Sequence, residues 1–224
     1  MVYKGGPTII SDHTQAKDLF EEQLNCLTHA IGAILAGIGT YFLVKQSLVF
    51  SDDLRVIAAL LYGTTITITL GLSAMFHGTK CKLLKRKFRI MDHASIYLMI
   101  AGSYSPLLLI PLKGKFGLIV LIATWLFAFL GILWKVFYFR ASKTLSIASY
   151  MILGWMGVFL INPMLETVPT VGLLLILVGG VVYTIGTFFY INDHRKYFHT
   201  IWHVLVLIGC AIHYFAISEY VITL

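Results

Sequence analysis

Charge is scarce in this sequence. Asp, Glu, Lys and Arg make up only 12% of the 224 residues and apolar types make up 58%, whereas a soluble domain carries about 25% charged residues. A chain with so few charges cannot cover its surface with polar groups, so we expect that surface to face lipid. The basic residues behind the net charge of +7 cluster between the apolar segments, and we find no nucleic-acid-binding module. This pattern favours the headgroup surface of a membrane and excludes nucleic acid as a partner.

Paired cysteines, linkers and an apolar leader are also missing. The three cysteines, Cys26, Cys81 and Cys210, show no close pairing, which argues against a disulfide framework. The first roughly 20 residues are polar, so we expect no cleavable signal peptide before the first apolar segment. No linker separates a second domain. The predicted organisation is a cytoplasmic tail over residues 1–25 and a single transmembrane domain over residues 26–224.

Seven apolar segments are long enough to cross about 30 Å of hydrocarbon as helices of about 20 residues each. They cover residues 26–44, 55–76, 91–111, 117–138, 146–162, 170–190 and 199–220. The tail predicts one further short helix over residues 12–25, at the membrane interface. The expected fold class is an all-α membrane protein, a bundle of seven transmembrane helices.

The distribution of Lys and Arg predicts the orientation of this bundle. Thirteen basic residues fall on the side of the N-terminus: Lys4, Lys17, Lys80, Lys82, Lys85, Arg86, Lys87, Arg89, Lys135, Arg140, Lys143, Arg195 and Lys196. Only four fall on the other side, namely Lys45, Arg55, Lys113 and Lys115. The positive-inside rule therefore places the N-terminus in the cytoplasm and the C-terminus outside the cell.

Histidines from distant segments reach the same membrane depth. His77 lies near the cytoplasmic end of the second span, and His199 and His203, four residues apart on one helical face, begin the seventh. Ionisable groups at such depths are costly and usually functional. Three neutral imidazoles with an open fourth position form a zinc site of the catalytic type. The sequence thus predicts a zinc site, although each histidine alone is also typical of an interfacial hydrogen-bonding residue.

Ser73 and Asp92 could complete the chemistry at this depth. Ser73 shares a helical face with His77 and could orient a water molecule or hydrogen-bond a ligand. Asp92 opens the third span and could hold and deprotonate a water molecule at the metal, because zinc lowers the pKa of water to about 7. Asp92 could instead pair with Arg89, and its neighbour His93 is expected to be structural.

A second group of polar residues lies on one face of the first span. Glu22, Asn25 and His29 are spaced i, i+3 and i+7. They could orient the metal ligands, or they could form a hydrogen-bond lock between the first span and its neighbours, which is the favoured interpretation. His213 follows His199 by 14 residues, or about 21 Å along a helix, so it cannot join the same metal ion.

Five motifs, in this order and spacing, resemble the hemolysin III proteins of bacteria, which belong to the progestin and adiponectin receptor superfamily. They are Glu22-x-x-Asn25-x-x-x-His29, Ser73-x-x-x-His77, Asp92 at the start of the third span, the sequence GSYSP at 102–106, and His199-x-x-x-His203. The likeness runs from about Glu21 to the C-terminus. The GSYSP sequence itself also predicts a kink and a close helix approach.

This resemblance implies seven helices, a cytoplasmic N-terminus and a Zn²⁺ ion near the cytoplasmic leaflet of the bacterial plasma membrane. It implies His77, His199 and His203 as ligands, with Asp92 reached through water and Ser73 at the family's serine position. Family members are similar to membrane hydrolases that include the alkaline ceramidases, and bacterial members are connected with membrane-lipid homeostasis. The sizeable soluble region of the adiponectin receptors has no counterpart here, which argues against a hormone-receptor role.

Three functions follow as expectations. The leading one is a zinc-dependent hydrolase that cleaves a lipid amide or ester in membrane-lipid homeostasis. The second is a non-catalytic sensor or regulator of membrane state, in which lipid is a ligand and zinc is structural. The third is a haemolytic pore-forming protein, against which the lack of an amphipathic pore segment argues. Membrane lipids are the expected partners, and no oligomeric state is predicted.

Overall fold

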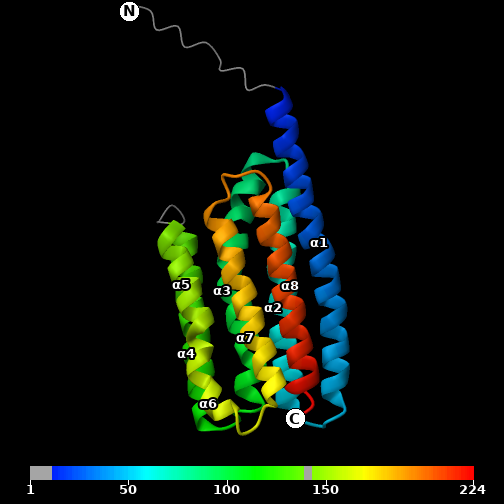
Figure 1. The fold of residues 1–224 in the computed structure, drawn as a ribbon, viewed down its shortest axis with the longest axis vertical. Coiled ribbons are helices and arrows are strands. Elements are labelled where there is room, and N and C mark those ends of the chain that lie inside the picture. Colours follow the sequence, from blue (N-terminus) through cyan, green and yellow to red (C-terminus); the bar gives the residue numbers. More distant parts are fainter. Residues whose placement is uncertain (1–11, 139–142) are drawn as a thin grey trace, which may run out of the picture.

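The structure is a computed structural model that describes the backbone of residues 12–138 and 143–224, with side chains from residue 19 onward. All regular elements in these residues are helices, and no strand occurs within them. In chain order they are α1 (Asp12–Leu48), α2 (Asp53–Gly78), α3 (Lys82–Leu109), α4 (Lys115–Phe137), α5 (Lys143–Trp155), the 3₁₀ helix η1 (Met156–Leu160), α6 (Ile161–Met164), α7 (Thr170–Ile191) and α8 (Phe198–Tyr220). Figure 1 shows the long helices side by side along one axis.

Six helical stretches in the described part of the chain are long and apolar enough to cross a membrane. They are Leu19–Leu48, Asp53–Gly78, Lys115–Phe137, Lys143–Met164, Thr170–Ile191 and Phe198–Tyr220. Helices are expected here because lipid offers no partner for an open backbone N–H or C=O group. The predicted third span lies in α3, which has 28 residues but is more polar than the six. The all-helical membrane fold is therefore confirmed with six spans, and the seventh span stays a prediction.

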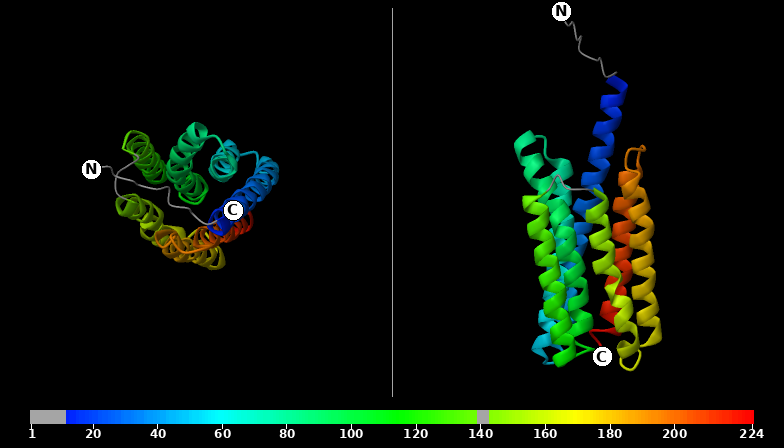
Figure 2. Two further views of the ribbon diagram at one scale, coloured as in Figure 1. Left: turned by 90° about the horizontal axis from the view of Figure 1, so that it is seen from above. Right: turned by 90° about the vertical axis from the view of Figure 1, so that its left-hand side faces the viewer.

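The helices run up and down in sequence and form a closed ring (Figure 2). Each of α1 to α4 packs beside the next, α7 packs beside α8, and α8 closes the ring against α1. We name the two ends of the bundle after the termini (Figure 1): α1 begins at the amino-terminal end and α8 finishes at the carboxy-terminal end. The end of α2, the start of α3 and the start of α8 therefore meet at the amino-terminal end.

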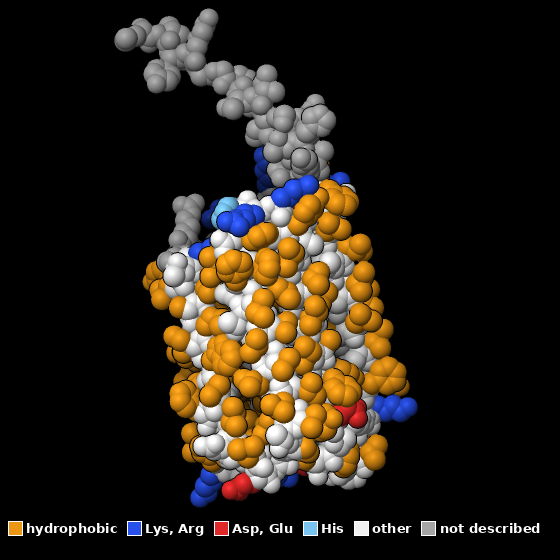
Figure 3. Space-filling view, viewed as in Figure 1, with side chains coloured by type: hydrophobic (Ala, Val, Ile, Leu, Met, Phe, Trp, Pro, Cys, Tyr) orange, Lys and Arg blue, Asp and Glu red, His pale blue; other side chains and the backbone are white. Residues whose placement is uncertain are grey.

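The sides of the bundle are apolar. Large apolar side chains such as Ile34, Ile119 and Phe159 are exposed, and Figure 3 shows hydrophobic side chains spread along the visible face with basic side chains mostly toward the ends. Such a continuous apolar surface is unfavourable in water and is expected against lipid. The interior between α2 and α8 is filled by buried side chains that include Leu70 and Ile217.

The first helix has no break at the predicted boundary of the tail. The segment predicted as a separate helix at residues 12–25 continues directly into the first span, because α1 is uninterrupted from Asp12 to Leu48. Residues 1–11 of the predicted tail lie outside the described residues. Glu21, Glu22 and Asn25 on the described part of this stretch of α1 reach the site described below.

The fifth span is interrupted, and a tyrosine on α3 forms hydrogen bonds with the backbone groups at the interruption. The helix changes from α5 to η1 at residue 156 and then continues as α6. The hydroxyl of Tyr104 lies 2.8 and 2.7 Å from the carbonyl oxygens of Leu153 and Gly154, and it accepts a hydrogen bond of 2.6 Å from the N–H of Gly157. Freed backbone groups at membrane depth need such partners. The GSYSP sequence thus holds the broken helix through its tyrosine.

Candidate metal centre

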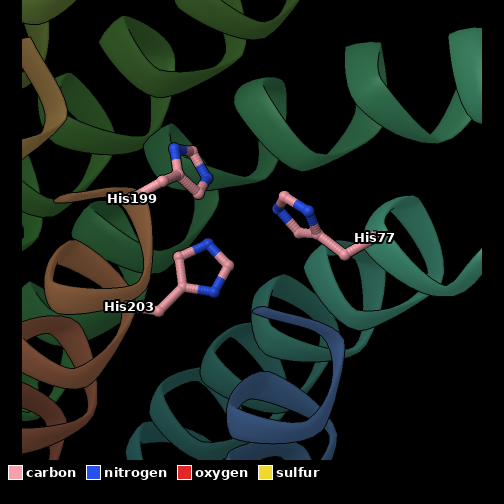
Figure 4. Close-up of side chains that lie close together, drawn as sticks. All are labelled: His77, His199 and His203. Atoms are coloured by element: carbon pink, nitrogen blue, oxygen red, sulfur yellow. The ribbon is translucent and has the colours of Figure 1, made fainter. Parts of the chain in front are cut away.

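The three histidines predicted as metal ligands lie together at the amino-terminal end of the bundle. His77 comes from the last turn of α2, and His199 and His203 come from the first two turns of α8. Ring centroids are 5.1 Å apart for His77 and His199, 4.9 Å for His77 and His203, and 4.7 Å for the pair on α8. One ligand atom from each lies within 4.8 Å of the other two, so this trio could hold a metal ion. Figure 4 shows the three rings around a common space.

The start of α8 sets the position of two of these rings. Because His199 and His203 are four residues apart, they project from the same face of the helix. Their helix begins after Tyr197, whose φ of 64° lies in the left-handed region that residues other than glycine rarely adopt. The backbone N–H of Tyr197 donates a hydrogen bond of 3.0 Å to Oε1 of Glu21 on α1. Glu21, which the motifs did not single out, therefore helps to hold the turn that places the pair.

Two of the imidazoles have a close oxygen acceptor beside Nδ1. Nδ1 of His77 lies 3.3 Å from Oε2 of Glu22, and Nδ1 of His203 lies 3.2 Å from the backbone oxygen of Asn25. An imidazole that donates its Nδ1 proton leaves the lone pair of Nε2 free, and this is the tautomer that binds a metal ion through Nε2. Nε2 of His77 is buried and has no hydrogen-bond partner among the described residues. A metal ion would satisfy that atom, so the donor set fits a metal ion.

Asp193 is the acidic neighbour of the third imidazole, within the range of an ion pair but beyond that of a hydrogen bond. Its Oδ2 atom lies 3.9 Å from Nδ1 of His199 and 2.9 Å from Nζ of Lys143. These two neighbours hold the pKa of the Asp193 carboxyl at about 2, below its ordinary value, so Asp193 is ionised at neutral pH. The sequence did not point to this residue, because it lies in a charged connection between α7 and α8 where side chains are usually solvated.

The polar face of α1, formed by Glu22, Asn25 and His29, makes hydrogen bonds with α3 and α8. Oε2 of Glu22 also accepts a hydrogen bond of 2.6 Å from Nζ of Lys85 on α3, and Oδ1 of Asn25 accepts one of 2.6 Å from Thr200 on α8. These contacts join α1 to other helices, as the predicted hydrogen-bond lock requires. The same two residues supply the oxygens beside His77 and His203. Both interpretations of this face are therefore compatible with its contacts.

His29, the third residue of that face, stacks on a predicted ligand. The rings of His29 and His203 are 3.7 Å apart between centroids and inclined by 9°. Both ring nitrogens of His29 are buried without a hydrogen-bond partner among the described residues. A parallel contact this close restricts rotation of the His203 ring. His213 lies further along α8, where Nε2 donates a hydrogen bond of 2.9 Å to the backbone oxygen of Ile176, away from the metal centre.

Ser73 and Asp92 line a cavity beside the trio. Two of the three imidazoles, those of His199 and His203, line the same cavity. Ser73 is buried on α2. The carboxylate of Asp92 lies 3.4 Å from Nδ1 of His93, the neighbour that was expected to be structural. The structure thus brings both predicted catalytic side chains to the space next to the predicted ligands.

This cavity has a volume of about 210 Å³ and an apolar lining along most of its length. Its lining includes His199 near the start of α8 and Ile217 near the end of that helix. These positions are 18 residues apart, or about 27 Å along the axis. The cavity therefore runs from the metal centre toward the carboxy-terminal end, and an extended hydrocarbon chain would find apolar contacts along it. We call it the apolar cavity.

The helices and the histidine trio define the class of this protein. It is a multi-pass, all-helical membrane protein with three histidines that could hold a metal ion at one end of the bundle. A family model described as Haemolysin-III related matches residues 17–214, which is most of the chain. The chain therefore belongs to the haemolysin-III related family, as the order of its motifs predicted.

Curated relatives cover nearly the whole chain. Hemolysin-3 of Bacillus cereus is 35% identical over 202 residues, covering 90% of this chain and 92% of the relative. The Hemolysin-3 homolog of Bacillus subtilis (strain 168) is 32% identical over 200 residues, covering 89% and 94%. The Monocyte to macrophage differentiation factor of Homo sapiens is 29% identical over 207 residues, covering 90% and 84%. With its apolar helices, the chain is thus a multi-pass protein of a bacterial membrane, as predicted.

Proposed function

We propose that the histidine trio binds Zn²⁺ and that the protein is a zinc-dependent membrane hydrolase. The observation that carries this proposal is the meeting of His77, His199 and His203. His77 and His203 each have an oxygen acceptor at Nδ1, and His199 has the Asp193 carboxylate 3.9 Å away. Three imidazole ligands with a fourth position left open are typical of catalytic zinc. Zinc also suits nitrogen ligands better than the harder cations magnesium and calcium, which prefer oxygen.

Basic residues support a cytoplasmic location for the centre. Of the thirteen assigned to the cytoplasmic side, ten have described side chains, and all ten belong to helix ends or connections at the amino-terminal end. By the positive-inside rule this end faces the cytoplasm. In this orientation α3 also crosses the membrane and brings the number of spans from six to seven. Its charged start, Lys82–Arg89, then lies at the level of the lipid headgroups. Its remaining 20 residues, up to Leu109, can cross about 30 Å.

The chain's own residues would divide the work of hydrolysis. A bound zinc ion would polarise a carbonyl group and lower the pKa of water toward about 7. Asp92 would act as the general base that accepts the proton of the attacking water, and Ser73 would orient that water. The apolar cavity would hold the acyl chain of a lipid amide or ester, with its carbonyl beside the histidines. Membrane lipids are therefore the proposed substrates, and membrane-lipid homeostasis is the proposed role.

The replacement Asp92→Asn tests this function because it removes the base and leaves all three imidazoles in place. We expect the variant to retain its zinc and to lose turnover by at least about 100-fold. Release of fatty acid from a panel of lipid amides and esters, followed by mass spectrometry, measures the loss. Asp53→Asn, an exposed position at the opposite end of α2, is the matched control and should keep full activity. Full activity of Asp92→Asn would refute the mechanism.

A second function, the membrane-state sensor, is favoured by one observation. The trio joins the last turn of α2 to the first turns of α8, so a bound metal would pin two helices together. In that case lipid would bias the helix arrangement and no bond would be cleaved. Zinc-loaded protein with no turnover on the whole lipid panel, together with a sharp loss of thermal stability on zinc removal, would favour the sensor.

A further inference from the structure

Polar side chains interrupt the lining of the apolar cavity at a distance from the metal centre. They are Tyr62 on α2, Tyr183 on α7 and His213 on α8, and all three line the cavity. Tyr62 precedes His77 by 15 residues, or about 22 Å along the axis of α2. His213 is similarly remote from His199, so Tyr62 and His213 lie too far away to touch a metal ion at the trio. We call Tyr62, Tyr183 and His213 the distal polar site.

The residues of the distal polar site are packed deep in the bundle. The rings of Tyr183 and His213 are 5.3 Å apart between centroids and meet edge to face at 79°. Tyr62 and Cys210 belong to one buried cluster, against which Tyr183 packs. Side chains from α2, α7 and α8 therefore come together along this part of the cavity wall.

Two of the three polar groups are engaged within the protein. The hydroxyl of Tyr183 donates a hydrogen bond of 3.3 Å to Sγ of Cys210. Nε2 of His213 donates one of 2.9 Å to the backbone oxygen of Ile176 on α7. The positions of these two side chains in the cavity wall are therefore set by the fold and do not depend on a ligand.

The hydroxyl of Tyr62 is the exception. The side chain is 0% exposed, and its oxygen has no hydrogen-bond partner among the described residues. A buried hydroxyl without a partner costs free energy, and such groups are rare in folded proteins. A phenylalanine ring would fill nearly the same volume without that cost. Because Tyr62 lines the apolar cavity, an occupant of that cavity can supply the missing partner.

The surroundings of Tyr62 select an uncharged partner. Asp92 is the one Asp, Glu, Lys or Arg among the described residues that line the cavity, and it lies next to the histidine trio. A charged group beside Tyr62 would be buried without a counter-ion, which is costly. A tyrosine hydroxyl both donates and accepts hydrogen bonds, and an alcohol does the same. A hydroxyl group on the ligand is thus the best-matched partner.

The position of Tyr62 also sets where on the ligand this hydroxyl belongs. With the carbonyl group of a lipid at the histidine trio, the hydrocarbon chain runs along the cavity toward the carboxy-terminal end. Tyr62 lies about 22 Å from His77 along α2, so its partner falls in the half of a long chain that is remote from the carbonyl group. A hydroxyl in the nearer half would stop short of Tyr62.

We propose that the distal polar site binds a hydroxyl group on the remote half of the ligand's hydrocarbon chain, with Tyr62 as its hydrogen-bond partner. The ligand class is then a lipid with a hydroxylated acyl chain, and the same lipid without the hydroxyl is a poorer ligand. The placement of the carbonyl group at the trio rests on the proposed function, whereas the hydrogen bond to Tyr62 does not.

A binding measurement on the full-length, zinc-loaded protein in detergent tests this inference without any turnover. The probes are stearic acid, 6-hydroxystearic acid and 14-hydroxystearic acid, and each affinity is taken from the shift in unfolding temperature over a titration. We expect the 14-hydroxy acid to bind about fivefold more tightly than stearic acid, because it gains one hydrogen bond. The 6-hydroxy acid should bind no more tightly than stearic acid. Equal affinity for all three, as a water molecule beside Tyr62 would give, would overturn the inference, and a preference for the 6-hydroxy acid would overturn the assigned half of the chain.

Variants separate the hydroxyl from the ring that carries it. Tyr62→Phe should bind the 14-hydroxy acid no more tightly than stearic acid, and its ligand-free unfolding temperature should not fall, because the lost hydroxyl has no partner in the protein. Tyr41→Phe makes the same change at a side chain that is 62% exposed on α1 and does not line the cavity, and it should keep the wild-type preference. A Tyr62→Phe protein that retains the preference, or that unfolds at a clearly lower temperature without ligand, would contradict the inference.

These outcomes are separate from those of the hydrolase assay. Protein that prefers 14-hydroxystearic acid and hydrolyses no lipid would leave the distal polar site standing and overturn the hydrolase. Protein that hydrolyses plain and hydroxylated lipids equally well and binds the three acids alike would do the reverse.

Discussion

At the scale of single residues, the centre depends on oxygen atoms beside Nδ1 as much as on the imidazoles. Glu22 and Asn25 from α1 and Asp193 from a connection each lie next to one ring. Such partners fix the tautomer and the orientation of metal-binding histidines, and their loss typically costs about 10–100-fold in metal affinity. The chain draws these oxygens from segments nearly 170 residues apart.

Replacing Glu22 with Gln should weaken metal binding while leaving the three ligands unchanged. The amide keeps the shape of the side chain but is a poorer acceptor than the carboxylate and loses the pair with Lys85. We expect zinc affinity to fall by about 10–100-fold, measured by competition with a chelator. Glu166→Gln, exposed at the opposite end of the bundle, controls for the change in net charge. Equal zinc affinity in the two variants would show that Glu22 does not orient His77.

The stacked ring of His29 gives a second prediction at this scale. If stacking restrains His203, a flat ring at position 29 should preserve zinc binding better than a small side chain does. His29→Phe should therefore retain zinc in a chelator titration that strips His29→Ala, because Ala removes the contact of 3.7 Å altogether. Equal loss in both variants would instead assign the effect to the ring nitrogens of His29.

At the scale of helices, the sequence predicts what local spacing determines. His199 and His203 lie on one face of α8 because a helix places i and i+4 together, and His77 meets them because consecutive spans reverse direction. Glu21 could not be predicted in this way, since its contact joins α1 to Tyr197 across more than 170 residues. Asp193 could not be predicted either, because it lies in a connection where no helical spacing relates it to His199. The break of the fifth span also involves contacts with Tyr104 that periodicity does not reveal.

The close helix approach predicted at GSYSP is confirmed and can be tested through one glycine. A Cβ atom on Gly102 would lie 1.9 Å from Oγ1 of Thr65 and 3.0 Å from the backbone oxygen of Leu61, so α3 packs directly on α2 there. Gly102→Ala should lower the free energy of unfolding by about 1–3 kcal/mol through overpacking. Gly71→Ala, on α2 with no atom within 4 Å of the added carbon, should not. Thermal unfolding in detergent compares them, and equal stability would contradict the packing.

At the scale of the whole molecule, the proposed orientation makes the amino-terminal end cytoplasmic. Cys81 is exposed in the connection between α2 and α3 at that end, and Thr223 is exposed at the other. A membrane-impermeant maleimide should therefore label Cys81 only in inverted vesicles, and Thr223→Cys in a Cys81→Ala background only in intact cells or right-side-out vesicles. The reverse pattern would place the metal centre on the outer face and contradict the positive-inside argument.

The central claim is that one chain holds one zinc ion through three histidines from α2 and α8. Metal analysis of the purified full-length protein, beside a His203→Ala variant that is still folded by circular dichroism, tests it most directly. The account predicts close to one zinc per wild-type chain and a loss of most of that zinc in the variant. Wild-type protein without stoichiometric zinc after expression in zinc-replete medium, or a variant that keeps its full zinc content, would contradict it.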